Sequence, residues 1–134
     1  VWPEHLPITV RISATEWVEG GWTVTDSVEL ARELINAGVD LVDCSSGGNI
    51  PIAQMPLGPG YQVPLSEAVR VTGMRTATVG LITEPEHADE IIRNGRADLV
   101  LLGREMLRDP HWALRAAQTL KQPVPVPNPY LRAY

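Results

Sequence analysis

Hydrophobic and polar positions along this chain alternate with a period of two in some segments and of 3.6 in others, and these periods predict alternating strands and helices. The segment ITVRIS (residues 8–13) alternates apolar and polar side chains, as a strand with two different faces does. One face carries Ile8, Val10 and Ile12, and the other carries Thr9, Arg11 and Ser13. Three further apolar segments predict strands at residues 39–46, 76–82 and 97–103.

Helical patterns separate these strands. An apolar stripe of period 3.6 predicts a helix from about Asp26, with Asp26 and Glu29 as a capping box and Gly38 as its stop. The remaining predicted helices are residues 65–71, a helix opened by a capping box in TEPE (83–86) and ending near 94–95, a short turn at 104–107, and residues 111–120. The tail from residue 121 contains four prolines and is predicted not to be helical.

Four strand–helix units in succession predict a parallel sheet with right-handed crossovers. Two α/β architectures remain open on this pattern: a doubly wound open sheet, and half of a (β/α)8 barrel, which takes about 250 residues when complete. The polar Arg11 favours the barrel, because the carboxyl end of a barrel interior is where a charged group meets a ligand. The long loop at residues 47–64 is of a length that is usually functional or disordered.

Length, charge and composition narrow the class of protein. The 134 residues suit one domain, and the net charge of -5 without a basic stripe argues against nucleic-acid binding. No apolar segment approaches a membrane span and no signal-peptide pattern is present, so the expected setting is cytoplasmic. The chain begins at Val1 almost directly before a strand, which we interpret as a cut inside a larger protein.

Two glycines and two arginines are the candidates for binding chemistry. Gly80 and Gly103 follow consecutive strands, where backbone N–H groups could approach a phosphate, and Arg104 could bind it with a two-pronged guanidinium contact. The alternative is that the glycines only permit tight packing and Arg104 is a surface charge. Arg11 is either a cation for a ligand that gains negative charge or an ion-pair partner of Asp43 or Asp40.

The other reactive residue types give weaker signals. Cys44 is the only cysteine and has no histidine positioned to activate it, so we expect a buried structural thiol. The three histidines are isolated, and no metal site is expected. Trp17 and Trp22 flank a Gly-Gly pair as a lid or as packing residues, and packing is favoured.

Five segments together resemble the C-terminal half of the Old Yellow Enzyme family, in its YqjM-like or thermophilic-like ene-reductase subgroup. The segments are VRIS, GVDLVDCSSGG, PGYQVP, VGLIT and NGRADLVLLGREMLRDPHW. The resemblance implies that residues 1–122 are strands five to eight of a TIM barrel with their helices, and that residues 123–134 are an extended tail reaching a neighbouring subunit. It also implies an enzyme that binds FMN and reduces activated alkenes with hydride from NAD(P)H.

The resemblance assigns roles to individual residues. Arg11 corresponds to the arginine beside the pyrimidine side of the flavin, and Arg132 to one that enters the neighbouring active site. The residues matching the FMN phosphate site are Gly80, Leu81, Gly103 and Arg104. The family's catalytic histidine pair, tyrosine and flavin-tuning cysteine belong to its N-terminal half, so no catalytic residue is expected in this chain.

The expected partners are therefore an N-terminal half-barrel, a second subunit bound through the tail, and a small alkene substrate. Two other interpretations remain. One is a flavin barrel of the dihydroorotate-dehydrogenase type, against which PGYQVP and the tail arginine argue. The other is a split or engineered half-barrel without catalytic activity.

Overall fold

A single parallel sheet organises the computed structural model, which describes residues 1–133. Its strands are β1 (Thr9–Ser13), β2 (Leu41–Ser45), β3 (Thr76–Thr78) and β4 (Leu99–Val100), and they lie side by side in sequence order. The predicted parallel α/β sheet is confirmed. β3 and β4 are shorter than predicted, because the chain leaves the sheet before the glycine-containing turns that follow each strand.

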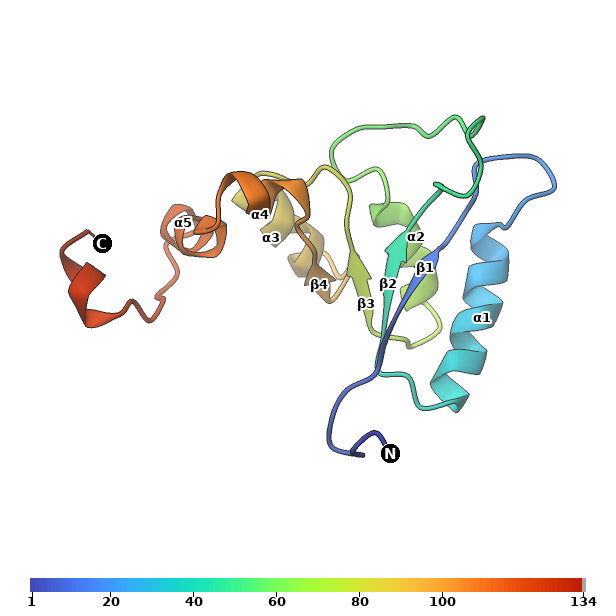
Figure 1. Cartoon of the computed structure of the whole chain (residues 1–134), viewed down its shortest axis with the longest axis horizontal. Helices are drawn as coiled ribbons and strands as arrows, with labels where there is room; N and C mark the ends of the chain where they lie inside the picture. Colours follow the sequence, from blue (N-terminus) through green and yellow to red (C-terminus); the bar gives the residue numbers. More distant parts are fainter. Residues whose placement is uncertain (134) are drawn as a thin grey trace.

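The helices are α1 (Val24–Asn36), α2 (Val63–Arg70), α3 (Pro85–Arg93), α4 (Arg104–Arg108) and α5 (Trp112–Thr119), followed by the 3-10 helix η1 (Asn128–Ala133). Figure 1 shows them ordered along the chain beside the sheet, with the C-terminal segment extending away from it. No helix within residues 1–133 is both long enough and apolar enough to span a bilayer.

Three local predictions are wrong. The capping box of α1 is formed by Thr23 and Asp26 rather than by Asp26 and Glu29, because the helix begins one turn earlier. The predicted box at residues 83–86 is not formed: the hydroxyl of Thr83 donates to the carboxylate of Glu84 instead of capping α3. The tail is not free of helix, since residues 128–133 form a short 3-10 helix.

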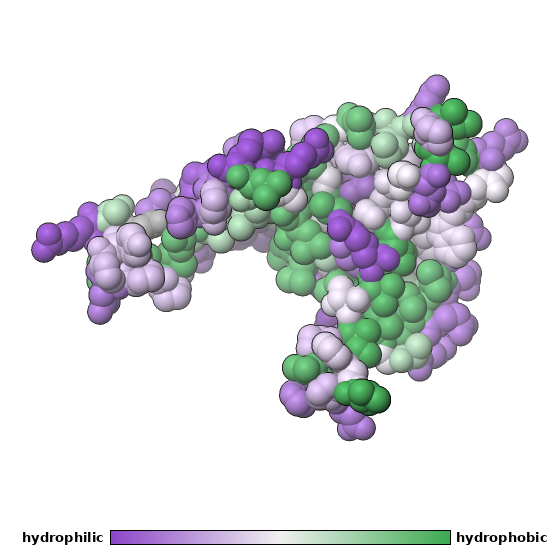
Figure 2. All heavy atoms as spheres, in the orientation of Figure 1, coloured by the Kyte–Doolittle hydropathy of each residue, from purple (hydrophilic) through white to green (hydrophobic). Residues whose placement is uncertain are grey.

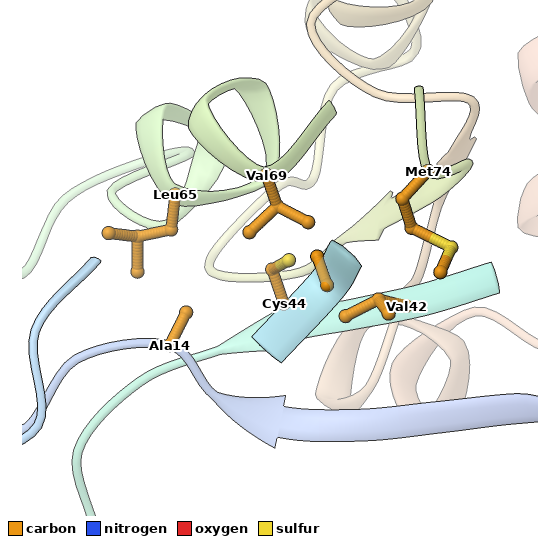
Figure 3. Packing of buried hydrophobic residues seen from close by; sticks show 7 residues of the cluster. Ala14, Val42, Cys44, Leu65, Val69 and Met74 are labelled. Atoms are coloured by element: carbon orange, nitrogen blue, oxygen red, sulfur yellow. The ribbon is translucent and has the colours of Figure 1, made fainter. Parts of the chain in front are cut away.

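One face of the sheet carries the hydrophobic core. Val42 and Cys44 of β2 are fully buried against α2 and the segment after it, as Figure 3 shows. This cluster of buried side chains comprises Ala14, Ala31, Val42, Cys44, Leu65, Val69 and Met74. A second cluster joins α3 and α5 to the same face through Val100. Helices on one face and strands in sequence order are consistent with part of a TIM barrel, and the doubly wound alternative, which needs helices on both faces, does not fit.

The opposite face of the sheet is open. One row of paired residues crosses it, namely Arg11, Asp43, Ala77 and Leu99. Leu99 remains 51% exposed, and Figure 2 shows apolar atoms gathered around the strands beside a hydrophilic group. Within this row Asp43 and Ala77 are buried, whereas Arg11 and Leu99 at its two ends are exposed. An apolar side chain on a parallel sheet, such as Leu99, is normally covered in a folded protein.

Asp98 fastens β4 and α2 to the amino end of β3. Its carboxylate accepts hydrogen bonds from Arg70 Nη2 at 2.9 Å, Arg70 Nε at 3.2 Å and the backbone N–H of Thr76 at 2.8 Å. The hydrogen bonds from Arg70 are the main reason that the pKa of Asp98 lies below its usual value. The ionised carboxylate therefore stabilises the folded state.

We expect Asp98→Ala to lower the free energy of unfolding by about 1–2 kcal/mol, because three hydrogen bonds to a partly solvated charge are lost. The pKa of Asp98 is lowered on folding, so its contribution is fully present above the ordinary aspartate pKa and is lost as the pH falls through the lowered value. Urea unfolding at neutral pH and at pH 3 measures both effects. Asp89→Ala, which removes a single ion pair to the exposed Arg93 on α3, is the control; an equal loss in both variants contradicts the prediction.

Candidate functional site

A pocket of about 140 Å³ lies where the carboxyl ends of β3 and β4 meet. Its lining residues are Val79, Gly80, Leu81, Ile82, Thr83, Leu101, Gly103, Arg104, Glu105 and Arg108. The structure thus brings together four of the residues singled out in the sequence, Gly80, Leu81, Gly103 and Arg104. Parallel pairing causes this convergence, since consecutive strands end at the same edge of the sheet.

The Gly80 side of the pocket packs against, and hydrogen-bonds to, the residues just before α2. Gly80 has φ +130°, and a Cβ there would lie 2.9 Å from Tyr61 Cε1. The carbonyl of Gly80 accepts a hydrogen bond from Gly60 N at 2.8 Å. The buried Gln62 donates to the carbonyl of Val79 at 2.7 Å. Glycine is therefore required at residue 80 both by its backbone conformation and by its close packing.

Leu81 continues this turn in an unusual conformation. Its φ is +53°, in the left-handed region that side chains with a Cβ rarely adopt. Its side chain is 39% exposed although it is large and apolar. Strain of this kind concentrates at ligand-binding turns, where the backbone must present its polar groups in one direction.

The Gly103 side is open, in contrast to Gly80. Among residues 1–133, no heavy atom lies within 4 Å of the position that a Cβ on Gly103 would occupy. Arg104 follows it, exposed, and among residues 1–133 it has no ion-pair partner. The pocket therefore combines accessible backbone with an unneutralised guanidinium, which suits an anion.

Arg11 lies apart from this pocket, on the open face of the sheet. Its Nε is 3.0 Å from Asp43 Oδ2, so one of the two ion pairs considered from the sequence is present. Asp40 instead accepts a hydrogen bond from Ile8 N. Burial raises the pKa of Asp43, and Arg11 opposes that rise by attracting the ionised form. The Arg11 side chain is still 58% exposed and remains accessible to a ligand.

The remaining candidates lie elsewhere. Arg132 is exposed on η1 and does not line the pocket. Trp17 packs against the first core cluster, which confirms the packing role expected of it. Trp22 is 40% exposed, and its indole donates to Ser27 Oγ at 2.6 Å. Cys44 is fully buried, and burial, aided by the charge of Asp43, raises the pKa of its thiol to about 12.

Sequence reasoning missed two groups of site residues. Gln62 and Tyr61 reach Gly80 from a loop almost twenty residues away, and no local pattern signals that contact. Glu105 and Arg108 also line the pocket and form an ion pair at 2.7 Å. Their i,i+3 spacing on a short helix was a readable signal for the pair, though not for its place in the pocket.

Comparisons with known proteins point to one family. The sequence model of the NADH:flavin oxidoreductase / NADH oxidase family matches residues 2–123. The chain is 47% identical over 129 residues to an NADPH dehydrogenase of Halalkalibacterium halodurans, 46% to one of Geobacillus thermodenitrificans and 43% to one of Listeria monocytogenes. Each match covers 96% of this chain and 38% of the relative, so the chain spans well under half the length of these proteins.

The thiol of Cys44 is expected to be unreactive in the folded protein, because it is buried and its thiolate is disfavoured at neutral pH. A disulfide reagent that releases a coloured thiolate should label no cysteine in the native sample at pH 7.5. The same sample in concentrated urea should release one equivalent at once. Rapid labelling of the native protein contradicts the prediction.

Proposed function

The chain belongs to the NADH:flavin oxidoreductase / NADH oxidase family, and we propose that its pocket between β3 and β4 holds the phosphate of FMN. The observation that carries the proposal is the lining of this pocket. Gly103 leaves its backbone open to a ligand, Gly80 and Leu81 present a strained turn opposite it, and Arg104 brings an unpaired positive charge. A phosphate dianion needs this combination of backbone donors and a guanidinium.

FMN, when bound, would supply hydride transfer from NAD(P)H to the activated C=C bond of an enone or a similar electrophilic alkene. The name NADPH dehydrogenase, carried by relatives 43–47% identical, supports NADPH as the donor. This chain's own contribution is binding and electrostatics. The phosphate pocket anchors one end of the cofactor, and Arg11, on the open face, offers a cation where negative charge accumulates on reduction.

We further propose that residues 1–122 are strands five to eight of the barrel and that an N-terminal half-barrel completes them. The exposed Leu99 on the open face and, within the described sheet, the unpaired outer edges of β1 and β4 support this assignment, because both are unfavourable in water. The missing half would supply the groups that bind the substrate and donate a proton. The tail with Arg132 would contact a second subunit, since its exposed Tyr130 and Leu131 offer apolar surface.

Arg104→Ala is expected to weaken FMN binding by about tenfold or more, since hydrogen bonds to charged groups contribute ~1.5–3 kcal/mol. Gly103→Val is expected to weaken it as well, because it adds a side chain where the phosphate must contact the backbone. A Cβ on residue 103 would meet no heavy atom of the described residues within 4 Å, so the added side chain would project toward the ligand rather than against its neighbours. Fluorescence titration of the assembled flavoprotein (this chain with the rest of its barrel) measures the Kd. Arg93→Ala on α3 is the matched control.

If both variants keep the affinity of the unmodified protein, the phosphate assignment is wrong. If the unmodified, assembled protein is colourless and binds no FMN, the interpretation as a non-catalytic half-barrel is favoured instead.

Arg11→Met is expected to lower the reduction potential of bound FMN, because the reduced, more negative cofactor loses a nearby cation while Asp43 stays in place. Arg11→Lys, which keeps the charge, should restore most of the potential. Spectroelectrochemical titration of the assembled protein gives the values. An unchanged or raised potential in Arg11→Met would mean that Arg11 only pairs with Asp43.

A further inference from the structure

The phosphate pocket contains a carboxylate, which an anion site would ordinarily exclude. Glu105 lines the pocket, and its side chain is only 15% exposed. Its Oε2 accepts hydrogen bonds from Arg108 Nη2 at 2.7 Å and Arg108 Nε at 3.1 Å. Arg108 lines the same pocket and is 63% exposed. The pair places one negative and one positive charge beside the position proposed for a dianion.

Arg115 is the second cation near Glu105, but its contact is weaker. Arg115 Nη2 is 3.7 Å from Glu105 Oε1, whereas Arg115 Nε binds Asp109 at 2.8 Å. Asp109 also accepts a hydrogen bond from His111 N. The α4–α5 segment therefore pairs two carboxylates with two arginines. Arg104 remains the arginine of this segment without a carboxylate partner among the described residues.

We propose that Glu105 sets the charge of the FMN phosphate site by holding Arg108 in an ion pair, so that the phosphate meets one free guanidinium instead of two. This inference rests on the proposed function. It makes Glu105 a residue that limits affinity, and Arg108 a residue that screens Glu105 from the phosphate. Removing the carboxylate should free Arg108 to attract the anion, whereas removing Arg108 should leave the half-buried carboxylate of Glu105, held only by the longer contact with Arg115, to repel it.

The opposite structural explanation makes a different prediction. If Glu105 serves only to hold α4 against α5, its loss loosens the turn that carries Gly103 and Arg104. FMN would then bind more weakly, and the thermal midpoint would fall. The sign of the change in affinity therefore separates the two explanations.

The experiment measures Kd values for FMN and for riboflavin, which has the same ring but no phosphate. The assembled flavoprotein is titrated in the unmodified form and as Glu105→Gln, Arg108→Met and the double variant. For partly screened charges we expect Glu105→Gln to bind FMN about fivefold more tightly and Arg108→Met about fivefold more weakly. The double variant should return close to the unmodified value. Each difference should shrink as salt is raised.

Riboflavin affinity should be the same in all four proteins. The control pair is Glu29→Gln and Arg32→Met on α1, which has the same i,i+3 spacing away from the pocket and should change neither affinity. Weaker or unchanged FMN binding in Glu105→Gln, or equal changes for riboflavin, overturns the inference. If Arg104→Ala still weakens FMN in that case, the proposed function stands without it; if FMN and riboflavin bind equally to the unmodified protein, both fail.

Discussion

The pairing of β3 with β4 is the interaction on which the site depends. Leu101 N donates to the carbonyl of Thr78 at 2.8 Å, just before each strand opens into its turn. That hydrogen bond sets the two turns side by side, so Gly80 and Gly103 face one pocket although 23 positions separate them in the sequence. At the other end of the same strand pair, the carboxylate of Asp98 accepts a hydrogen bond from the backbone N–H of Thr76. A short ladder, two residue pairs long, thus positions the whole anion site.

The Arg11–Asp43 ion pair is the main polar feature of the open face of the sheet. Arg11 and Asp43 form a pair on a face that also carries Thr9 and Ser13 beside the apolar Leu99, and among the described residues one oxygen of Asp43 is buried without a hydrogen-bond partner. A guanidinium over half exposed can hold its carboxylate and still contact a ligand. The structural and the functional interpretations of Arg11 are therefore compatible. The ion pair fixes the side chain on the face where we propose that the flavin lies.

The sequence was informative where the signal was local or periodic. Alternation identified β1, and the glycines after two apolar segments identified the turns that converge on the pocket. It failed where two local caps compete and where a contact depends on a distant segment. At α1 the pattern predicts a start at Asp26, but Thr23, three residues earlier, caps the helix by exchanging hydrogen bonds with Asp26. The hydrogen bond from Gln62 to Val79 and the position of Glu105 in the pocket depend on tertiary contacts, which the spacing of residues in the sequence does not predict.

The left-handed backbone of Leu81 has a consequence for mutational tolerance. Its side chain is 39% exposed, and exposure alone suggests that almost any residue is accepted there. The φ of +53° contradicts that expectation, because few residue types adopt this backbone conformation without strain. Glycine or asparagine would relax the turn, whereas valine or isoleucine would add the steric cost of a branched Cβ to a conformation that already costs about 1–2 kcal/mol. Residue 81 is thus a surface position with the narrow substitution spectrum of a buried one.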